Sequence, residues 1–563
     1  MTLHNDSSAN KARNNHRQLL KVGRRVFLAG LVVSVSGCQN MIRRGQSPDD
    51  APILQLYDEN KKSSDTKYIG DVCGIYGLNF SAVEGIGLAK GLKGKGSPAK
   101  AGSHRDHVLR ALEMKPGDVD SKKALASRNT EIVLMKGLLP PGIRAGDTFD
   151  LEVSVMPNSD AESIEDGMLL QTRMQVAKKL GGSVKFGHVE ALGRGRILVD
   201  ALFETRKDKP NHLHGVVLGG GKALEDRPLG LVVRVATVSP KTTTYISRAI
   251  NSRFSTRSEA GRMGVAEPKD DRRVDLLVPD AYRHNVGRYL AVVKNLTYSE
   301  PDTKRVERLE ELDEQMGQPS ASALTALRLE AMGKSGIPSL KRALRHKDLE
   351  VQFHAAQALS YLGQTDGVDI LKKAAKQEPA FRWHSLTALA SLDDLTSAKA
   401  LEELLHVNSA ETRYGAFRSL RVQAPTGPIT SGRWLAGDFF LHEIQSKAEP
   451  MMHFSRSKRP EIVVFGDQQT VADNFIHAQP GLTVRAIGDS KVSVTAFSEE
   501  FGKEKTICSN RVSDLVETLA EKGYGYGSLL KIFREAKKSD TVNTRLVVNA
   551  VPKLGRTYTP DEF

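Results

Sequence analysis

The chain has 563 residues, of which 39% are hydrophobic and 26% are charged, and its formal net charge is +14. This composition is typical of a folded protein and excludes an intrinsically disordered chain. The longest apolar run, residues 26–35, is about half as long as a membrane-spanning helix, which excludes a protein with several such helices. Three cysteines are too few for a disulfide-dense scaffold or a four-thiolate zinc site.

Residues 1–37 have the features of an export signal. A basic, polar segment precedes the apolar run, and small residues follow it. Arg24 and Arg25 lie in a stretch that resembles a twin-arginine export motif. Residues 35–38 resemble a bacterial lipobox, in which Cys38 is acylated. An ordinary cleaved signal or an uncleaved anchor is the alternative. We expect residues 38–67, which are polar and rich in Pro, Ser and Lys, to form a tether.

Export also places the other cysteines in an oxidising compartment. Cys73 and Cys508 can pair there and join the start of the folded region to its last segment. Two free, buried thiols are the alternative, because spacing in the sequence does not show whether two Cα atoms lie close together.

Residues 68–300 predict an α+β block. Residues 149–155 alternate apolar and polar side chains, which is typical of a half-buried strand. Further expected strands are residues 131–135, 197–202, 231–238 and 274–278, and expected helices are residues 103–114, 244–254 and 281–293.

Residues 301–430 predict helices only, arranged as a repeat. Leu329, Leu359 and Leu389 are thirty residues apart, and the same step relates Leu344, Ala374 and Leu404. One helical pair cannot bury its own apolar face, so a repeat of this length indicates a short solenoid. The segment resembles HEAT repeats. Solenoids mostly bind partners; the alternative is a rigid spacer.

Residues 440–563 return to a mixed pattern. Expected strands are residues 462–465, 482–486, 492–496 and 546–551, and expected helices are residues 513–521, capped by Ser513, and 528–537. The predicted fold is therefore α+β, a mixed core in two sequence blocks interrupted by an all-α solenoid.

The candidate motifs for catalysis, cofactor binding and metal binding are all incomplete in this sequence. Gly219-Gly220-Gly221-Lys222 is followed by Ala223, where a phosphate-binding loop needs Ser or Thr. His212 and His214 lack a third metal ligand nearby in the sequence. We expect no metal, no cofactor and no nucleic acid. The basic charge favours anionic surfaces such as peptidoglycan or lipid headgroups.

Several segments together carry a resemblance to the bacterial flagellar basal-body P-ring protein family. Residues 83–96 hold the pattern G-x-G-L-x-x-G-L-x-G-x-G, with Gly85, Gly87, Gly91, Gly94 and Gly96. Pro140, Pro141 and Gly142 precede an Arg-x-Gly turn and the alternating strand, in the order that the family shows. Residues 162–172, residues 249–254 and the closing helix pair also resemble family segments, and they occur in the same order.

The resemblance implies a structural, non-catalytic subunit of a periplasmic ring, which acts as a bushing around the flagellar rod. It implies many identical copies in a ring, next to rod and L-ring proteins, with peptidoglycan or the outer membrane as a further contact of the lipid anchor. We interpret the five glycines as a packing or assembly loop, and Pro140-Pro141-Gly142 as a stiff turn that can also serve assembly. A flexible surface loop is the alternative for the glycines.

The lipobox and the central helical repeat depart from the family pattern. The alternative function is therefore a lipid-anchored periplasmic scaffold or binding protein that has the fold without a flagellar role. The partner of the helical repeat is not specified by the sequence. An exported enzyme is the third and weakest possibility.

Overall fold

The computed structural model describes residues 67–114, 120–180, 183–203, 211–258, 261–498 and 502–558, and all of them belong to the unit Gly45–Phe563. The predicted export signal with Arg24 and Arg25, the predicted lipidated Cys38 and the tether up to residue 66 lie outside the described residues. No helix in the described part is long and apolar enough to cross a membrane.

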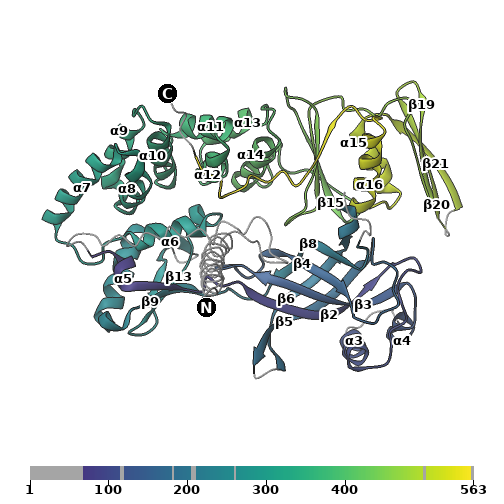
Figure 1. The fold of residues 1–563 in the computed structure, drawn as a ribbon, viewed down its shortest axis with the longest axis horizontal. Coiled ribbons are helices and arrows are strands. Elements are labelled where there is room, and N and C mark those ends of the chain that lie inside the picture. The colour runs from purple at the N-terminus through teal and green to yellow at the C-terminus, as the bar shows by residue number, and fades with distance from the viewer. Residues whose placement is uncertain are drawn as a thin grey trace, which may run out of the picture. The chain divides into compact units, whose positions relative to one another are not determined.

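The first sheet closes on itself. Its strands follow the order β4-β3-β2-β5-β6-β8-β7, and β4 also pairs with β8. Their bounds are β2 Ser81–Lys90, β3 Thr130–Leu139, β4 Thr148–Val155, β5 Met168–Leu180, β6 Ser183–Arg196, β7 Leu198–Val199 and β8 His214–Ala223. Helices α3 (Ser103–Glu113) and α4 (Ser121–Leu125) cover part of it through Val108 and Leu125, which pack with Leu88 and Ile132 (Figure 1).

The second sheet has the order β1-β9-β13-β12, and each neighbouring pair is antiparallel. Its strands are β1 Cys73–Tyr76, β9 Leu229–Val233, β12 Ala266–Pro268 and β13 Arg273–Leu276. A hairpin, β10 (Ser255–Ser258) and β11 (Gly261–Gly264), follows helix α5 (Pro240–Arg253). Helices α2 (Ile69–Val72), α5 and α6 (Val286–Lys294) share one hydrophobic core with this sheet.

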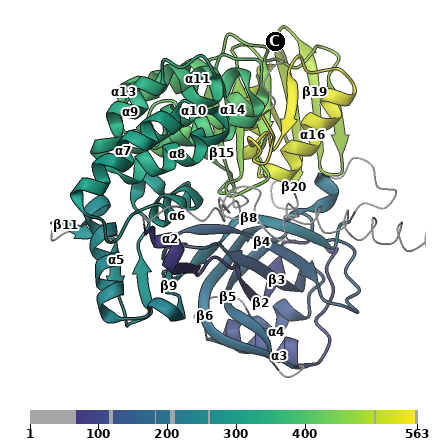
Figure 2. The ribbon, with the colours of Figure 1, turned by 60° about the vertical axis from the view of Figure 1, so that its left-hand side comes forward.

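The helical repeat follows directly. Its helices are α7 Asp302–Met316, α8 Pro319–Ala331, α9 Ile337–Ala343, α10 Leu349–Tyr361, α11 Val368–Gln377, α12 Pro379–Ala390, α13 Leu395–Leu404 and α14 Ala410–Gln423. Figure 2 shows these helices packed side by side in succession. Leu329, Leu359 and Leu389, which carry the thirty-residue step, are all fully buried. The predicted repeat is confirmed, because its periodic positions form the core between helices.

The C-terminal block contains two further sheets. A mixed sheet has the order β14-β15-β17-β16-β22, and an antiparallel sheet has the order β18-β19-β20-β21. The strands are β14 Arg433–Leu435, β15 Phe439–Ile444, β16 Met451–Phe454, β17 Glu461–Phe465, β18 Ile476–Gln479, β19 Leu482–Gly488, β20 Lys491–Ser498, β21 Gly502–Ser509 and β22 Arg545–Val548. Helices α15 (Val512–Glu521) and α16 (Tyr526–Lys538) complete the block.

One hydrophobic core joins the closed sheet to the C-terminal block. Leu198 and Leu202 belong to the same cluster as Tyr526 and Leu530 of α16. The backbone carbonyl of Leu202 also accepts a hydrogen bond from the Arg534 guanidinium. The two sequence blocks therefore fold together, and the helical repeat is inserted between them. The predicted fold class is confirmed.

Some expected element bounds were wrong. Residues 197–202 form only the short β7 followed by a 3₁₀ turn at Asp200–Leu202, and the strand expected at residues 231–238 ends at Val233. Helix α15 begins one residue before Ser513, and its N-cap residue is Arg511. Ser513 is not needed as a cap, because the Val512 amide donates to the Gln469 carbonyl oxygen at 2.8 Å.

Of the two alternatives for Cys73 and Cys508, the structure has the unpaired one: both are free thiols. Cys73 lies in the core of the second sheet, whereas Cys508 packs against the core shared by the closed sheet and the C-terminal block. Folding thus places the two thiols in different cores, and burial raises the pKa of Cys73 to about 11.

Candidate functional site: the glycine strand and two buried clamps

The glycine motif begins inside strand β2. Gly85 and Gly87 pair with β3 on one side of the strand, and the backbone lies close to β5 on the other. A Cβ atom at Gly87 would lie 2.4 Å from Thr172 Oγ1, and one at Gly85 would lie 2.8 Å from the Arg173 carbonyl oxygen. The interpretation as a loop is therefore wrong for these two residues. Their lack of a side chain allows close packing within the sheet.

The rest of the motif forms the turn after β2. Gly91 and Gly94 both have φ of +82°, a conformation that glycine adopts without strain. A Cβ atom at Gly96 would lie 2.3 Å from the Thr130 carbonyl oxygen. These contacts are all made within the chain, and a role of the glycines in assembly stays a prediction.

The Pro140-Pro141-Gly142 segment is the turn between β3 and β4, and Gly142 has φ of +70°. Arg144 follows it and donates to the Val278 carbonyl oxygen at 2.6 Å. This contact holds the turn close to the second sheet. The Pro140-Pro141-Gly142 turn borders one cavity and the glycine turn after β2 borders another.

The cavity beside this turn has a volume of about 560 Å³ and is bordered by all three blocks. Five cationic side chains line it: Arg144, Arg283, Arg418, Arg421 and Lys458. Several have carboxylate partners, since Arg283 pairs with Asp147 and Arg421 pairs with Glu461. The first of these pairs lies within the N-terminal block, and the second connects the helical repeat to the C-terminal block.

His284 also lines this cavity. Burial lowers the pKa of His284 to about 4, and the positive charges of Lys458, Arg283 and Arg418 also lower it. His284 is therefore neutral at pH 7. The two histidines considered from the sequence lie near carboxylates. His212 Nδ1 lies 3.6 Å from Glu165 Oε2, and His214 contacts Asp200 and Glu152, whose hydrogen bonds raise the pKa of His214 to about 9.

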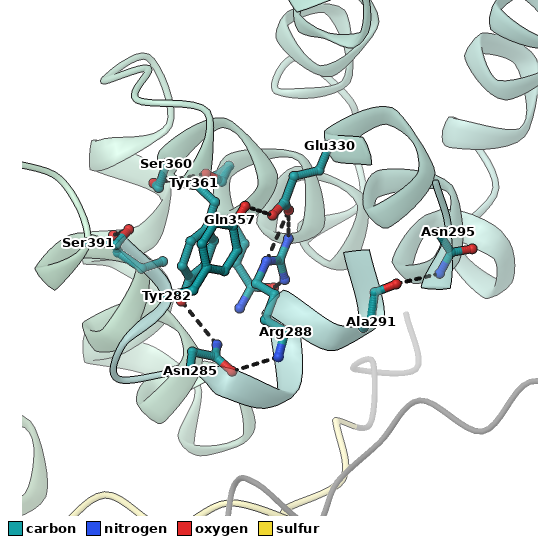
Figure 3. Close-up of polar contacts among 12 residues, drawn as sticks. Tyr282, Asn285, Arg288, Ala291, Asn295, Glu330, Gln357, Ser360, Tyr361 and Ser391 are labelled. Atoms are coloured by element: carbon teal, nitrogen blue, oxygen red, sulfur yellow. Dashed lines mark hydrogen bonds and ion pairs between the residues drawn. The ribbon is translucent and has the colours of Figure 1, made fainter. Parts of the chain in front are cut away.

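A buried carboxylate connects the helical repeat to the second sheet. Glu330 of α8 has no exposed surface, and its Oε2 accepts from Arg288 Nε at 3.0 Å and Nη2 at 2.5 Å. Its Oε1 accepts from the Tyr282 hydroxyl at 2.6 Å. Arg288 and Tyr282 lie at α6 and just before it, so this contact crosses from one block to the other (Figure 3).

Helix α10 completes this cluster. Gln357 Oε1 accepts from Arg288 Nη1 at 2.5 Å, and the Tyr361 hydroxyl accepts from Asn285 Nδ2 at 3.0 Å. The Tyr361 ring stacks on Tyr282 at 4.7 Å and lies 4.8 Å from the Arg288 guanidinium. We name this cluster the N-terminal clamp; its residues are Tyr282, Asn285, Arg288, Glu330, Gln357 and Tyr361.

A second buried carboxylate connects the other end of the repeat to the C-terminal block. Glu461 begins strand β17 and is fully buried. Its Oε1 accepts from the Tyr414 hydroxyl at 2.7 Å, and its Oε2 pairs with Arg421; both partners come from α14. Burial alone would raise the pKa of Glu461, but the Arg421 guanidinium and the other donors around it lower that pKa.

Two fully buried histidines lie beside Glu461. His453 stacks on Tyr414 at 3.6 Å, and its Nε2 accepts from the Ala550 amide at 2.9 Å, so the ring proton is on Nδ1. Neither ring nitrogen of His442 has a hydrogen-bond partner among the described residues. Burial lowers the pKa of His442 to about 4 and that of His453 to about 3. We name Tyr414, Arg421, His442, His453 and Glu461 the C-terminal clamp.

The sequence analysis did not predict either clamp, although the sequence position of each buried glutamate is unusual. Glu330, Ser360 and Ala390 occupy equivalent positions of the thirty-residue repeat. A carboxylate at a position that holds a small residue in the other repeats, buried at Ser360, indicates a buried partner. Glu461, immediately before the apolar residues of β17, is a similar signal. In the described residues, no group of three or more His, Cys, Asp or Glu side chains is arranged to hold a metal ion.

Comparison with protein families gives two separate matches. Residues 68–308 match the family described as the flagellar P-ring protein, and residues 337–421 match HEAT repeats. The first match covers the closed sheet and the second sheet, and the second covers α9 to α14.

Curated relatives agree with the first match. The flagellar P-ring protein of Thermotoga maritima is 27% identical over 240 residues, which are 41% of this chain and 66% of the relative. That of Bdellovibrio bacteriovorus is 26% identical over 250 residues, or 43% of this chain and 67% of the relative. That of Anaeromyxobacter dehalogenans is 27% identical over 353 residues, or 60% of this chain and 84% of the relative.

The chain thus spans slightly less than two thirds of the Thermotoga relative. The longer Anaeromyxobacter match extends beyond the segment that the family model covers. The resemblance inferred from the sequence is confirmed: this chain joins a segment similar to the flagellar P-ring protein, at residues 68–308, to HEAT repeats at residues 337–421.

Proposed function

We propose that the chain is a structural subunit of a flagellar P ring in the periplasm, where it acts as a bushing around the rod and carries no catalytic activity. The observation that carries the proposal is the match of residues 68–308 to the flagellar P-ring protein. Many copies of the chain would form a closed ring next to rod and L-ring proteins.

The architecture supports a load-bearing role. The C-terminal block shares its core with the closed sheet, so the P-ring-like framework is continuous around the helical repeat. Glu330 and Glu461 are fully buried and tie both ends of the repeat to that framework. Buried ionic groups of this kind fix the geometry of an interface. A rigid repeat would then present its partner-binding surface at a constant position on every subunit.

The sequence supports the location. The twin-arginine-like Arg24 and Arg25 would direct export, and acylated Cys38 would anchor the chain to a membrane, with the outer membrane or peptidoglycan as a contact. The helical repeat would bind a further partner, because solenoids present extended surfaces.

The test is imaging of basal bodies extracted from wild-type cells and from cells that lack the gene. We expect the deletion to remove a periplasmic ring and abolish swimming, and the wild-type gene to restore both. A Cys38→Ala gene supplied to the deletion strain separates anchoring from ring formation. Intact rings and normal swimming in the deletion strain would overturn the proposal.

The second candidate is a lipid-anchored periplasmic scaffold of the same fold without a flagellar role. The helical repeat and the lipobox favour it, because both depart from the family pattern. Intact rings in the deletion strain, together with loss of a periplasmic complex captured through residues 302–423, would support this candidate instead.

A further inference from the structure

The antiparallel sheet β18–β21 has one buried and one exposed face. Leu482, Val484, Val492 and Val494 point into the core shared with the closed sheet. The alternate residues of the same strands point away from this core, because successive side chains in a strand face opposite ways.

The exposed face combines apolar and cationic side chains. Ile476, Phe497 and Ile507 each expose more than half of their surface. Ile476 pairs with Arg485, Arg485 with Ser493 and Ser493 with Ile507, so these residues form one row across the four strands, in which Ser493 is buried and the other three are exposed. Exposed apolar groups that cluster in this way are typical of interaction sites.

The cations of this face are Arg485, Lys503 and Lys505, and all three are exposed. Lys503 pairs with Phe497 across the strands, and its ammonium lies 5.8 Å from the ring. We name Ile476, Arg485, Phe497, Lys503, Lys505 and Ile507 the sheet patch. Its chemistry fits a partner that offers carboxylates around an apolar centre.

Helix α7 at the start of the helical repeat offers that chemistry. It packs through Arg308, Leu312 and Met316. Its opposite side exposes Val306, Glu307, Glu310, Glu311 and Glu314, which we name the α7 face. The four glutamates follow the i, i+3, i+4, i+7 spacing of one helix face.

These glutamates repel one another within the free chain. Like charges three or four residues apart destabilise a helix. Ion pairs to these four carboxylates do not occur in the described part of the chain. Within the described residues these four carboxylates are therefore available to cations of a partner.

Resting on the proposed ring function, we propose that the sheet patch of one copy binds the α7 face of a second copy. Both surfaces are exposed in the same chain, so they cannot be bound to each other within it. The contact joins two different surfaces and is therefore heterologous, the type that closes into rings.

The dimensions of the two surfaces are compatible. Three strand spacings separate β18 from β21, about 14 Å. Helix α7 has fifteen residues and is about 22 Å long. The helix can therefore cross all four strands of the sheet.

The test is charge reversal followed by charge exchange in the full chain, read as oligomer mass by analytical ultracentrifugation. K503E/K505E and E310K/E311K are each expected to weaken self-association at least about tenfold, because like charges then face each other. The chain that carries all four changes, and an equimolar mixture of the two double variants, are both expected to recover assembly. K373E/K376E on α11, which changes two exposed lysines outside both surfaces, is the matched control.

A monomeric wild-type chain, double variants that assemble like wild type, or four changes that do not restore assembly would each overturn this contact. If both double variants assemble normally and K503E/K505E binds less to anionic vesicles or peptidoglycan, the sheet patch binds an anionic surface instead. The outcome is independent of the deletion experiment: a purified chain can assemble through these surfaces even if no flagellar ring is lost, and a ring can be lost although this contact fails.

Discussion

The N-terminal and C-terminal clamps differ in what surrounds the buried carboxylate. In the N-terminal clamp, Glu330 accepts two hydrogen bonds from Arg288 and one from Tyr282, with amide groups nearby. In the C-terminal clamp, Glu461 has an arginine and a tyrosine as partners but also has His442 3.7 Å away, too far for a hydrogen bond. The same ion-pair chemistry is thus set in two different surroundings.

The histidines of the C-terminal clamp lie against its carboxylate and its tyrosine, whereas two other buried histidines with lowered pKa values, His354 and His384, lie within electrostatic range of Arg288 in the N-terminal clamp. Arginine stays charged at every pH that a folded protein meets, so the Arg288–Glu330 pair persists until the carboxylate is protonated. Burial lowers the pKa values of His442 and His453 and thus keeps both neutral well below pH 6.5. We therefore expect acid to act on the C-terminal clamp through groups that contact its members directly.

The largest expected effect is loss of one ionic partner. Arg288→Met leaves Glu330 buried without its cation and should lower the free energy of unfolding by about 3–5 kcal/mol. Adding Glu330→Leu should recover most of this loss, because no isolated charge then remains. Denaturant unfolding measures both values. A double variant that is no more stable than Arg288→Met would contradict this explanation of the N-terminal clamp.

The next effect is acid sensitivity at the C-terminal clamp. Because the folded-state pKa values of His442 and His453, about 4 and about 3, lie below the ordinary value of 6.5, their stabilising contribution is complete above pH 6.5. It falls as the pH decreases toward 4, by up to roughly 1.4 kcal/mol per pH unit for each histidine.

Unfolding free energies measured between pH 7 and 4 test this dependence. The variant His442→Gln/His453→Gln should show a smaller slope, whereas His188→Gln, at an exposed position, should keep the slope of wild type. An unchanged slope in the double variant would show that these histidines are not the groups that titrate.

A smaller effect is expected from removing one hydroxyl at each clamp. Tyr282→Phe and Tyr414→Phe keep the stacked rings but remove a hydrogen bond to a buried carboxylate, which should cost about 1.5–3 kcal/mol each. Burial raises the pKa of both tyrosines well above its ordinary value, so both are protonated donors. Values below about 0.5 kcal/mol, the size of typical surface effects, would mean that these bonds do not stabilise the clamps.

The smallest effect is expected at Gln357. Its Oε1 accepts from Arg288, but its Nε2 is buried without a partner in the described part of the chain. Gln357→Met removes one favourable bond and one unsatisfied donor, so the net change should stay within about 1 kcal/mol. A loss as large as that of Arg288→Met would place Gln357 at the centre of the N-terminal clamp.

The sequence predicted what depends on local pattern. The thirty-residue step of Leu329, Leu359 and Leu389 located the repeat, because the same core position recurs in each helical pair. Strand β4 was predicted from its alternation of apolar and polar residues, and α5 was predicted from the helical spacing of its apolar residues. The fold class follows from these patterns.

The features that the sequence did not predict depend on contacts between residues that are distant in the chain. The glycine-rich pattern predicted a loop at Gly85 and Gly87, yet both lie in strand β2, where the close approach of β5 favours residues without a side chain. Arg288 and Glu330 are 42 residues apart, and Arg421 and Glu461 are 40 apart. The sequence position of each glutamate indicates burial, but nothing local identifies its arginine, because only packing of separate elements brings each pair together.

The most direct test of the central claim is cryo-electron tomography of the flagellar motor in intact cells, with averaging of the periplasmic ring. We expect a ring that depends on this gene, in which each subunit shows ordered density for the helical repeat, since both of its ends are tied to the framework. A ring of unchanged size and density in cells that lack the gene would contradict the proposed function.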